Sequence, residues 1–199
     1  MDVWKRLLVI FLVTLSCVGC DQGTKLLAAE HLPKFQMTSY LNDLLRVGYT
    51  ENIGVFLGLG NNLSEQARFW FFVVLVGAFL LALLVYLVSN AKQHLVPLIA
   101  LSLVFSGGMS NFYDRVVNNG AVIDFLNIGI GSIRTGIFNV ADIAIMFGVF
   151  LLIFAQSKHK PTVSKSTNRS FIWFWLTPHG CACSTSFNQL PQAMNHHVA

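Results

Sequence analysis

Four apolar stretches separated by polar segments dominate the pattern along the chain. Three of them hold 19 or 20 residues each: Phe69 to Val88, Leu95 to Tyr113 and Ile137 to Ala155. The only charged residue in these three stretches is Asp142. A helix needs about 20 apolar residues to cross a bilayer, so each stretch predicts a transmembrane helix. A shorter stretch, Leu7 to Cys20, reaches spanning length if its helix runs from Trp4 to about Leu27.

The segments between these helices carry strand patterns. In the first long loop, Arg46 to Tyr49 and Val55 to Leu59 predict short strands, and Ser64 predicts a cap for the next helix. In the second loop, Ala121 to Ile130 is apolar and β-branched, which predicts a strand-like or re-entrant segment along the membrane surface. The fold class is therefore all-α integral membrane. We expect four transmembrane helices. A small extracytoplasmic β-rich and loop portion connects helices 1 and 2, and a short strand-like segment connects helices 3 and 4.

Composition and charge fit a membrane protein and set its orientation. Hydrophobic residues make up 54% of the chain and charged residues 11%, whereas soluble domains average about 25% charged. Basic residues lie before the first span, between the second and third, and after the fourth: Lys5, Arg6, Lys92, Lys158, Lys160, Lys165 and Arg169. The positive-inside bias then places both termini in the cytoplasm. The net charge of +4 reflects this topology, and we expect no nucleic-acid partner.

The chain divides into a membrane domain, residues 1–156, and a basic tail, residues 157–199. The tail has no acidic residue, and we predict that it is cytoplasmic and disordered. Its aromatic segment, Phe171 to Leu176, is too short to span a bilayer and fits an interfacial anchor. The four cysteines predict no metal site: Cys17 and Cys20 lie in an apolar span without further ligands, and Cys181 and Cys183 lie in the reduced tail.

Two aspartates stand out as candidates for chemistry. An ionised aspartate at the centre of a membrane helix costs about 2.5–3.5 kcal/mol, so Asp142 needs compensation. Asn139 and Asp142 have capping-box spacing, and such a cap would account for Asp142 without catalysis. Asp124, between apolar neighbours, is either a solvent-facing strand position or a placed functional group. Two carboxylates that share a dehydrated site do not both ionise easily, so the pair can act as base and acid on one water.

A polar cluster ends the third span. Asn111, Asp114 and Arg115 share one helical face after the pair Gly107 and Gly108. One interpretation is helix packing with an Arg–Asp pair at the interface. In the other, Arg115 and Asn111 hold a substrate backbone or support an aspartate.

Five motif blocks occur in order across these spans. They are Asp21-Gln22-x-x-Lys25, Asn52-x-Gly54, Gly107-Gly108-x-x-Asn111-x-x-Asp114-Arg115, Gly120-x-Val122-x-Asp124-Phe125 and Phe138-Asn139-x-Ala141-Asp142. Together they resemble bacterial lipoprotein signal peptidase (signal peptidase II) over about residues 4–157. Two features depart from the family pattern: Phe56 and Leu57 follow Val55 where the family has a small residue and then Phe, and the tail is longer.

The resemblance implies a metal-free aspartyl endopeptidase of the inner membrane, without a cofactor, whose site faces the periplasm. It would cut prolipoproteins just before a diacylglyceryl-modified cysteine. Asp124 and Asp142 would be catalytic. The residues implied to bind substrate or support the site are Asn52, Gly54, Asn111, Asp114, Arg115, Asn139, Asp21 and Lys25. The implied partners are prolipoproteins, membrane lipids and the inhibitor globomycin, and we expect a monomer.

Two alternatives remain open. A small proton-coupled transporter would use Asp124 and Asp142 as relay groups, although both lie on one side and Phe69 to Val88 offers no polar group. The chain could instead be a lipoprotein itself, with Cys20 as the lipid-attachment site. The sequence leaves open which aspartate is the general base and what register the loop around residues 52–58 adopts.

Overall fold

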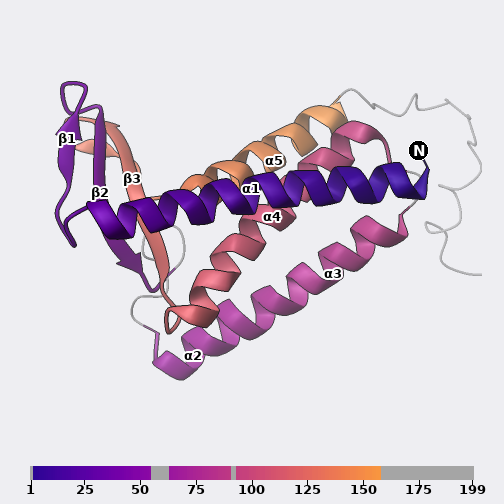
Figure 1. Ribbon diagram of the computed structural model, residues 1–199, viewed down its shortest axis with the longest axis horizontal. Coiled ribbons are helices and arrows are strands. Elements are labelled where there is room, and N and C mark those ends of the chain that lie inside the picture. The colour runs from indigo at the N-terminus through magenta and orange to yellow at the C-terminus, as the bar shows by residue number, and fades with distance from the viewer. Residues whose placement is uncertain (1, 55–62, 91–92, 158–199) are drawn as a thin grey trace, which may run out of the picture. The chain divides into compact units, whose positions relative to one another are not determined.

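The computed structural model describes residues 2–54, 63–90 and 93–157. In chain order its elements are α1 (Val3–His31), β1 (Thr38–Tyr40), β2 (Leu45–Asn52), α2 (Glu65–Phe69), the π-helix η2 (Trp70–Leu75), α3 (Val76–Ser89), α4 (Leu95–Val117), β3 (Val122–Ile130), β4 (Ile133–Arg134) and α5 (Val140–Ser157). Figure 1 shows the strands gathered beside the C-terminal end of α1. The predicted strand Val55 to Leu59 and the tail beyond Ser157 lie outside the described residues.

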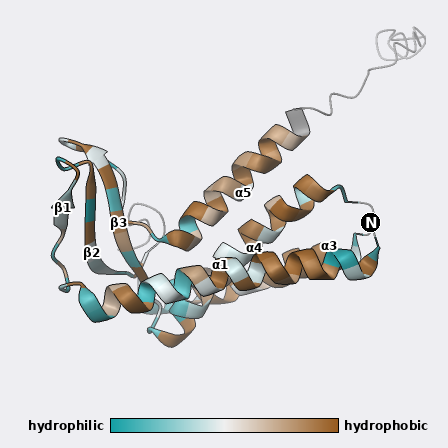
Figure 2. Cartoon of the chain, turned by 45° about the horizontal axis from the view of Figure 1, so that its top comes forward, coloured by the Kyte–Doolittle hydropathy of each residue, from teal (hydrophilic) through white to brown (hydrophobic). Residues whose placement is uncertain are grey.

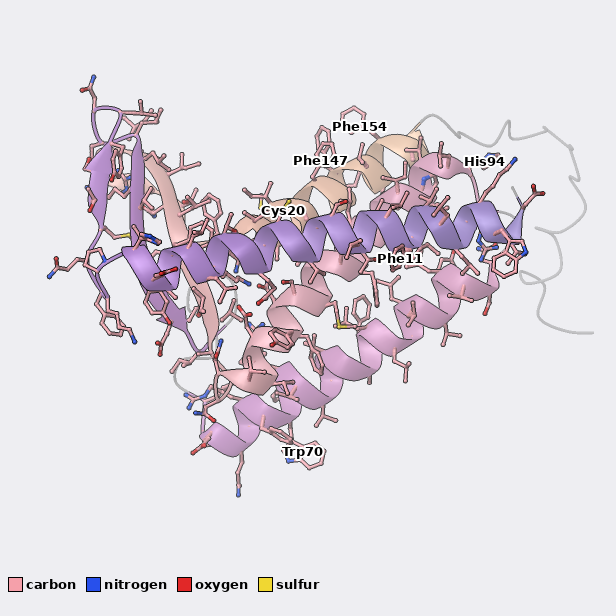
Figure 3. The ribbon with its side chains drawn as sticks, in the orientation of Figure 1. Phe11, Cys20, Trp70, His94, Phe147 and Phe154 are labelled. Carbon is pink, nitrogen blue, oxygen red and sulfur yellow. The ribbon has the colours of Figure 1, made fainter. Side chains whose placement is uncertain are left out.

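Apolar helices occur at the four predicted spans. In the part of the chain that the structure describes, three helices are long and apolar enough to cross a membrane: α1, the continuous helix Glu65–Ser89 formed by α2, η2 and α3, and α4. A shorter apolar helix covers Val140–Ala155 in α5. In Figure 2 hydrophobic colours dominate the helices, whereas the strands are mixed in colour and the end of α1 beside them is hydrophilic. Trp70, Phe147 and Phe154 point away from the bundle and are more than half exposed, as lipid-facing side chains would be (Figure 3).

The starts of the predicted second and fourth spans have local explanations. The Ser64 hydroxyl accepts a hydrogen bond from the Ala67 amide, which confirms the predicted cap. The last helix begins at Val140, and the predicted start at Ile137 was wrong. Phe138 instead pairs with Leu126 of β3, so the backbone before Asn139 is tied to the sheet and cannot be helical.

One four-stranded antiparallel sheet joins the two loops, in the order β1-β2-β3-β4. Two separate strand regions were predicted, but their pairing into one sheet was not. Asn52, the last residue of β2, lies opposite Val122, and Thr50 lies opposite Asp124. This register places the end of β2 next to the beginning of β3, where Asp124 lies.

Close helix packing brings α5 onto α4. A Cβ atom at Gly107 of α4 would overlap the carbonyl oxygen of Ala141, and one at Gly148 of α5 would lie 2.6 Å from the carbonyl oxygen of Ala100. The glycines therefore permit the approach of the two backbones, as small residues do between membrane helices. This contact sets the first turn of α5 against the polar face of α4.

The end of the bundle away from the sheet has an apolar core. Its buried members come from α1, α3 and α4: Ile10, Leu80, Leu83, Leu87, Leu98 and Phe105. Arg6 is also buried there, and its guanidinium donates to the carbonyl oxygens of Leu87 (2.7 Å) and Val88. Because the last carbonyls of a helix lack partners within it, Arg6 caps α3 from α1.

Candidate active site

Asn139 joins the two candidate aspartates. Asp124 lies on β3 and is 2% exposed, whereas Asp142 lies in the first turn of α5 and is half-buried. The Asn139 side-chain amide donates to Asp124 Oδ1 at 2.7 Å. The Asn139 backbone N–H donates to Asp142 Oδ2 at 3.1 Å. Both carboxylates therefore contact one residue at the junction of the sheet and α5.

The predicted capping box is confirmed. The Asp142 backbone N–H donates to Asn139 Oδ1 at 3.0 Å, which is the reciprocal of the bond from the Asn139 N–H to Asp142. The cap fixes the orientation of the Asp142 carboxylate. It also explains why an acidic residue is tolerated here, since the first turn of a helix favours negative charge.

Each aspartate has a second amide donor from another element. Asn52 of β2 donates to Asp124 Oδ2 at 2.9 Å, and Asn111 of α4 donates to Asp142 Oδ1 at 2.9 Å. All four carboxylate oxygens of the pair are thus held by N–H groups. Such donors orient a carboxylate without neutralising it, and among the described residues neither aspartate forms an ion pair.

Burial dominates the electrostatics of Asp124. The pKa of Asp124 is raised to about 7, chiefly by removal from water and also by the negative charge of Asp142. The hydrogen bonds from Asn52 and Asn139 act in the opposite direction, because they stabilise the ionised form. Asp124 can therefore both hold and release a proton near neutral pH.

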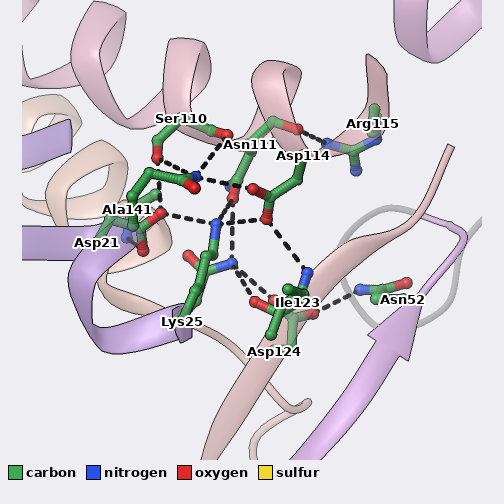
Figure 4. A network of polar contacts seen from close by, with 12 residues as sticks. Asp21, Lys25, Asn52, Ser110, Asn111, Asp114, Arg115, Ile123, Asp124 and Ala141 are labelled. Carbon is green, nitrogen blue, oxygen red and sulfur yellow. Dashed lines mark hydrogen bonds and ion pairs between the residues drawn. The ribbon is translucent and has the colours of Figure 1, made fainter. Parts of the chain in front are cut away.

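A buried ionic network lies beside the aspartates (Figure 4). The Lys25 ammonium lies 2.6 Å from Asp21 Oδ2 and 2.8 Å from Asp114 Oδ2, and each of the three residues is at most 1% exposed. The predicted Asp21–Lys25 pair is confirmed. Of the two interpretations of the Asn111–Arg115 cluster, the one with an Arg–Asp pair does not hold: Asp114 pairs with Lys25, because it faces α1.

Four more groups donate hydrogen bonds to the carboxylates of Asp21 and Asp114. They are the Ser110 hydroxyl and the Ala141 backbone N–H on Asp21, and the Gln22 amide and the Ile123 backbone N–H on Asp114. These contacts tie α1 to α4 and to the start of α5, and they tie α4 to β3. Sequence reasoning quoted Gln22 but gave it no role, and it missed Ser110. The signal for Ser110 was its spacing of four residues from Ser106 and Asp114, on one helical face.

The network also fixes the orientation of Asn111. Its Oδ1 accepts hydrogen bonds from the Lys25 ammonium at 2.9 Å and from the Asn139 amide at 3.0 Å. The Asn111 amide nitrogen must then face Asp142. Lys25 thus contacts neither candidate aspartate but sets which end of Asn111 is presented to one of them.

Arg115 joins α4 to the backbone that follows β2. Its guanidinium donates to the carbonyl oxygens of Gly54 at 2.9 Å and Asn111 at 3.2 Å. The Gly54 N–H in turn donates to Asn52 Oδ1 at 3.0 Å. Every candidate residue of the sequence analysis therefore lies in one connected cluster, and the sites predicted on separate loops and spans meet.

Comparison with known proteins identifies the family of the chain that carries this cluster. Residues 13–158 match the family model described as Signal peptidase (SPase) II. The chain belongs to the signal peptidase II family. A lipoprotein signal peptidase from Syntrophus aciditrophicus (strain SB) is 36% identical over 152 residues, which cover 75% of this chain and 92% of that protein. One from Staphylococcus aureus (strain bovine RF122 / ET3-1) is 31% identical, over 74% of this chain and 86% of that protein.

Solved structures of bacterial membrane enzymes share this fold. A structure described as "Bacterial membrane enzyme structure by the in meso method at 1.9 A resolution" is 29% identical, with a TM-score of 0.65 over 76% of this chain and 94% of that chain. A second, at 2.3 Å, is 31% identical with the same TM-score. As a member of the signal peptidase II family with several apolar helices, the chain is a peptidase and a multi-pass membrane protein.

Proposed function

We propose that the chain is an aspartyl endopeptidase that removes the signal peptide from prolipoproteins, just before a diacylglyceryl-modified cysteine. The observation that supports this most directly is the pair of carboxylates, Asp124 and Asp142, held by one asparagine. The lipoprotein substrate is taken from the relatives, which are named lipoprotein signal peptidase.

In the proposed reaction the two aspartates divide the acid and base roles. One carboxylate takes a proton from a water, and the hydroxide equivalent attacks the scissile carbonyl carbon. The other carboxyl group gives a proton to the leaving nitrogen. The raised pKa of Asp124 favours Asp124 as the proton-bearing member. Asp142, aligned by its capping box and by Asn111, then acts as the base, and the reaction as proposed uses no metal or cofactor.

The proposed orientation of the chain in the membrane puts the two aspartates at the periplasmic surface. With four spans and both termini in the cytoplasm, the sheet, the end of α4 and the start of α5 meet at the periplasmic face of the inner membrane. The substrate's acyl chains would remain in the bilayer while its scissile bond reaches the aspartates. Globomycin would occupy the same site, and one copy of the chain would suffice for activity.

The transporter alternative requires a polar path through the whole bundle. Between Asp21 and Arg6 along the bundle, the buried polar side chains among the described residues are hydroxyls, Ser102 and Ser106. Both hydroxyls donate to carbonyl oxygens of their own helix. A relay needs groups that titrate, so this path does not favour proton transport.

The test uses purified protein in micelles with a diacylglyceryl-modified prolipoprotein and its unmodified form. Asp124→Asn and Asp142→Asn should each abolish cleavage of the modified substrate, and the unmodified substrate should not be cut by any form. Glu30→Gln removes an exposed carboxylate at the end of α1 and serves as the matched control, with activity retained. Cleavage at the wild-type rate by either aspartate variant would refute the proposed dyad.

A further inference from the structure

A π-helix interrupts the second apolar helix next to the site. η2 spans Trp70–Leu75 between α2 and α3. π-helical turns are rare and occur frequently at functional sites, because the extra residue turns the following side chains to a new face. Here Phe72 faces α4, with its ring centroid 5.6 Å from the Arg115 guanidinium carbon. Its neighbours Trp70 and Phe71 are more than half exposed.

The ring of Phe72 limits where the Arg115 side chain can lie. A guanidinium within about 6 Å of a ring centroid is attracted to its face. Phe72 and Arg115 also line a cavity of about 290 Å³, together with Glu65, Arg68 and Phe69. Without the ring, the guanidinium would have space to swing into this cavity, where Glu65 offers a carboxylate. It would then leave the carbonyl oxygen of Gly54.

The hydrogen bond between Arg115 and Gly54 is linked to Asp124 through Asn52. The Gly54 carbonyl accepts from Arg115, while the Gly54 N–H donates to Asn52 Oδ1. With its oxygen engaged in this way, Asn52 turns its amide nitrogen to Asp124 Oδ2 at 2.9 Å (Figure 4). The position of the donor on Asp124 therefore depends on the position of Gly54.

We propose that Phe72 is a positioning residue for Asp124, acting through Arg115 and the Asn52–Gly54 turn. The inference rests on the proposed peptidase function, because it assigns Phe72 an effect on the rate of that reaction. Phe72 itself contacts neither aspartate. Its ring holds Arg115, Arg115 holds Gly54, and Gly54 orients the amide that aligns one carboxylate.

The experiment measures kcat and KM for the diacylglyceryl-modified substrate in micelles. Phe72→Leu removes the ring and keeps an apolar side chain. It should lower kcat by about 2- to 30-fold, the range for one cation–π contact, and leave KM nearly unchanged. Phe72→Trp keeps an aromatic face and should restore most of the loss. Phe71→Leu, at a lipid-facing neighbour, is the matched control and should behave as the wild type. If Phe72→Leu does not fold, Phe72→Met carries the same prediction.

A double variant tests the route. In the Asn52→Ala background the turn no longer supplies a donor to Asp124, so Phe72→Leu should cause no further loss. The inference is overturned if Phe72→Leu keeps the wild-type kcat, if only KM changes, if Phe72→Trp is as slow as Phe72→Leu, or if the two losses multiply.

Asp124→Asn in the same assay separates the inference about Phe72 from the proposed peptidase mechanism. If it is inactive while Phe72→Leu is fully active, only the role of Phe72 fails. If Asp124→Asn is active, the peptidase mechanism fails.

Discussion

The two ends of the helical bundle are stabilised in different ways. At the sheet-side end, charged, amide and hydroxyl side chains are buried, and each is matched by partners on other elements: Asp21, Lys25, Ser110, Asn111, Asp114 and Asn139. At the far end, apolar side chains form the core, and Arg6 is the buried charge among the described residues there. Replacing a buried ion pair by apolar residues is often neutral or stabilising. The difference therefore indicates that the sheet-side network is there to hold groups in position, while the far end supplies packing.

The largest effect is expected from Lys25→Met. It leaves the Asp21 and Asp114 carboxylates buried without their cation, which costs about 3–5 kcal/mol when one partner of a buried pair is removed. Unfolding by SDS titration in micelles should show this loss. Arg6→Met at the far end is the comparison. It removes hydrogen bonds to two carbonyl oxygens and should cost less, about 1–3 kcal/mol. Equal costs for the two variants would show that the ends do not differ.

Leu87→Ala should reduce stability without altering the chemistry. Leu87 is fully buried in the far core, and truncation of such a leucine costs about 2–5 kcal/mol. Under conditions where the variant is folded, kcat and KM should stay within about twofold of wild type, as for independent sites. A clear fall in kcat of the folded variant would mean that the far end is coupled to the site.

In contrast to Leu87→Ala, Asn139→Ala should lower kcat strongly and the free energy of unfolding only slightly. It removes the amide donor to Asp124 and the oxygen that caps α5. Loss of alignment of reacting groups can cost about 100-fold in kcat, whereas loss of a helix cap costs about 0.5–2 kcal/mol in stability. Ser64→Ala, which removes the cap of α2, is the matched control. It should lose comparable stability and keep its kcat.

The smallest effect concerns pH. With Asp124 as the proton-bearing member, kcat/KM should fall as the pH rises through about 7, the pKa of that carboxyl. The Asn52 hydrogen bond stabilises the ionised form and lowers this pKa. Asn52→Ala should therefore raise the pKa and move the alkaline limb of the profile to higher pH. Asn127→Ala, at a buried asparagine of β3 that donates to the Thr135 carbonyl, should leave the limb in place. A shift of the limb to lower pH in Asn52→Ala would contradict the assignment of Asp124.

The sequence predicted features that depend on local spacing. The apolar runs gave the helices, the Asn139-x-x-Asp142 spacing gave the capping box, and the i,i+4 spacing gave the Asp21–Lys25 pair. The sequence did not predict which side chains on different helices and strands would contact one another. The pairing of Asp114 with the adjacent Arg115 was one of two interpretations left open, and Asp114 pairs with Lys25, because the α1–α4 packing decides which side chain faces which. The joining of β2 and β3 in one sheet, which brings Asn52 to Asp124, likewise depends on long-range pairing that no local pattern encodes.

The central claim is that Asp124 and Asp142 act together on one water, and a double-mutant cycle tests it most directly. The measurement is kcat for the diacylglyceryl-modified prolipoprotein with Asp124→Asn, Asp142→Asn and the double variant, each shown to be folded. Residues that act as a unit give losses that do not add. We predict that each single variant falls to background and that the double variant is no slower than the worse single variant. Multiplying losses, or substantial turnover by either single variant, would contradict the account.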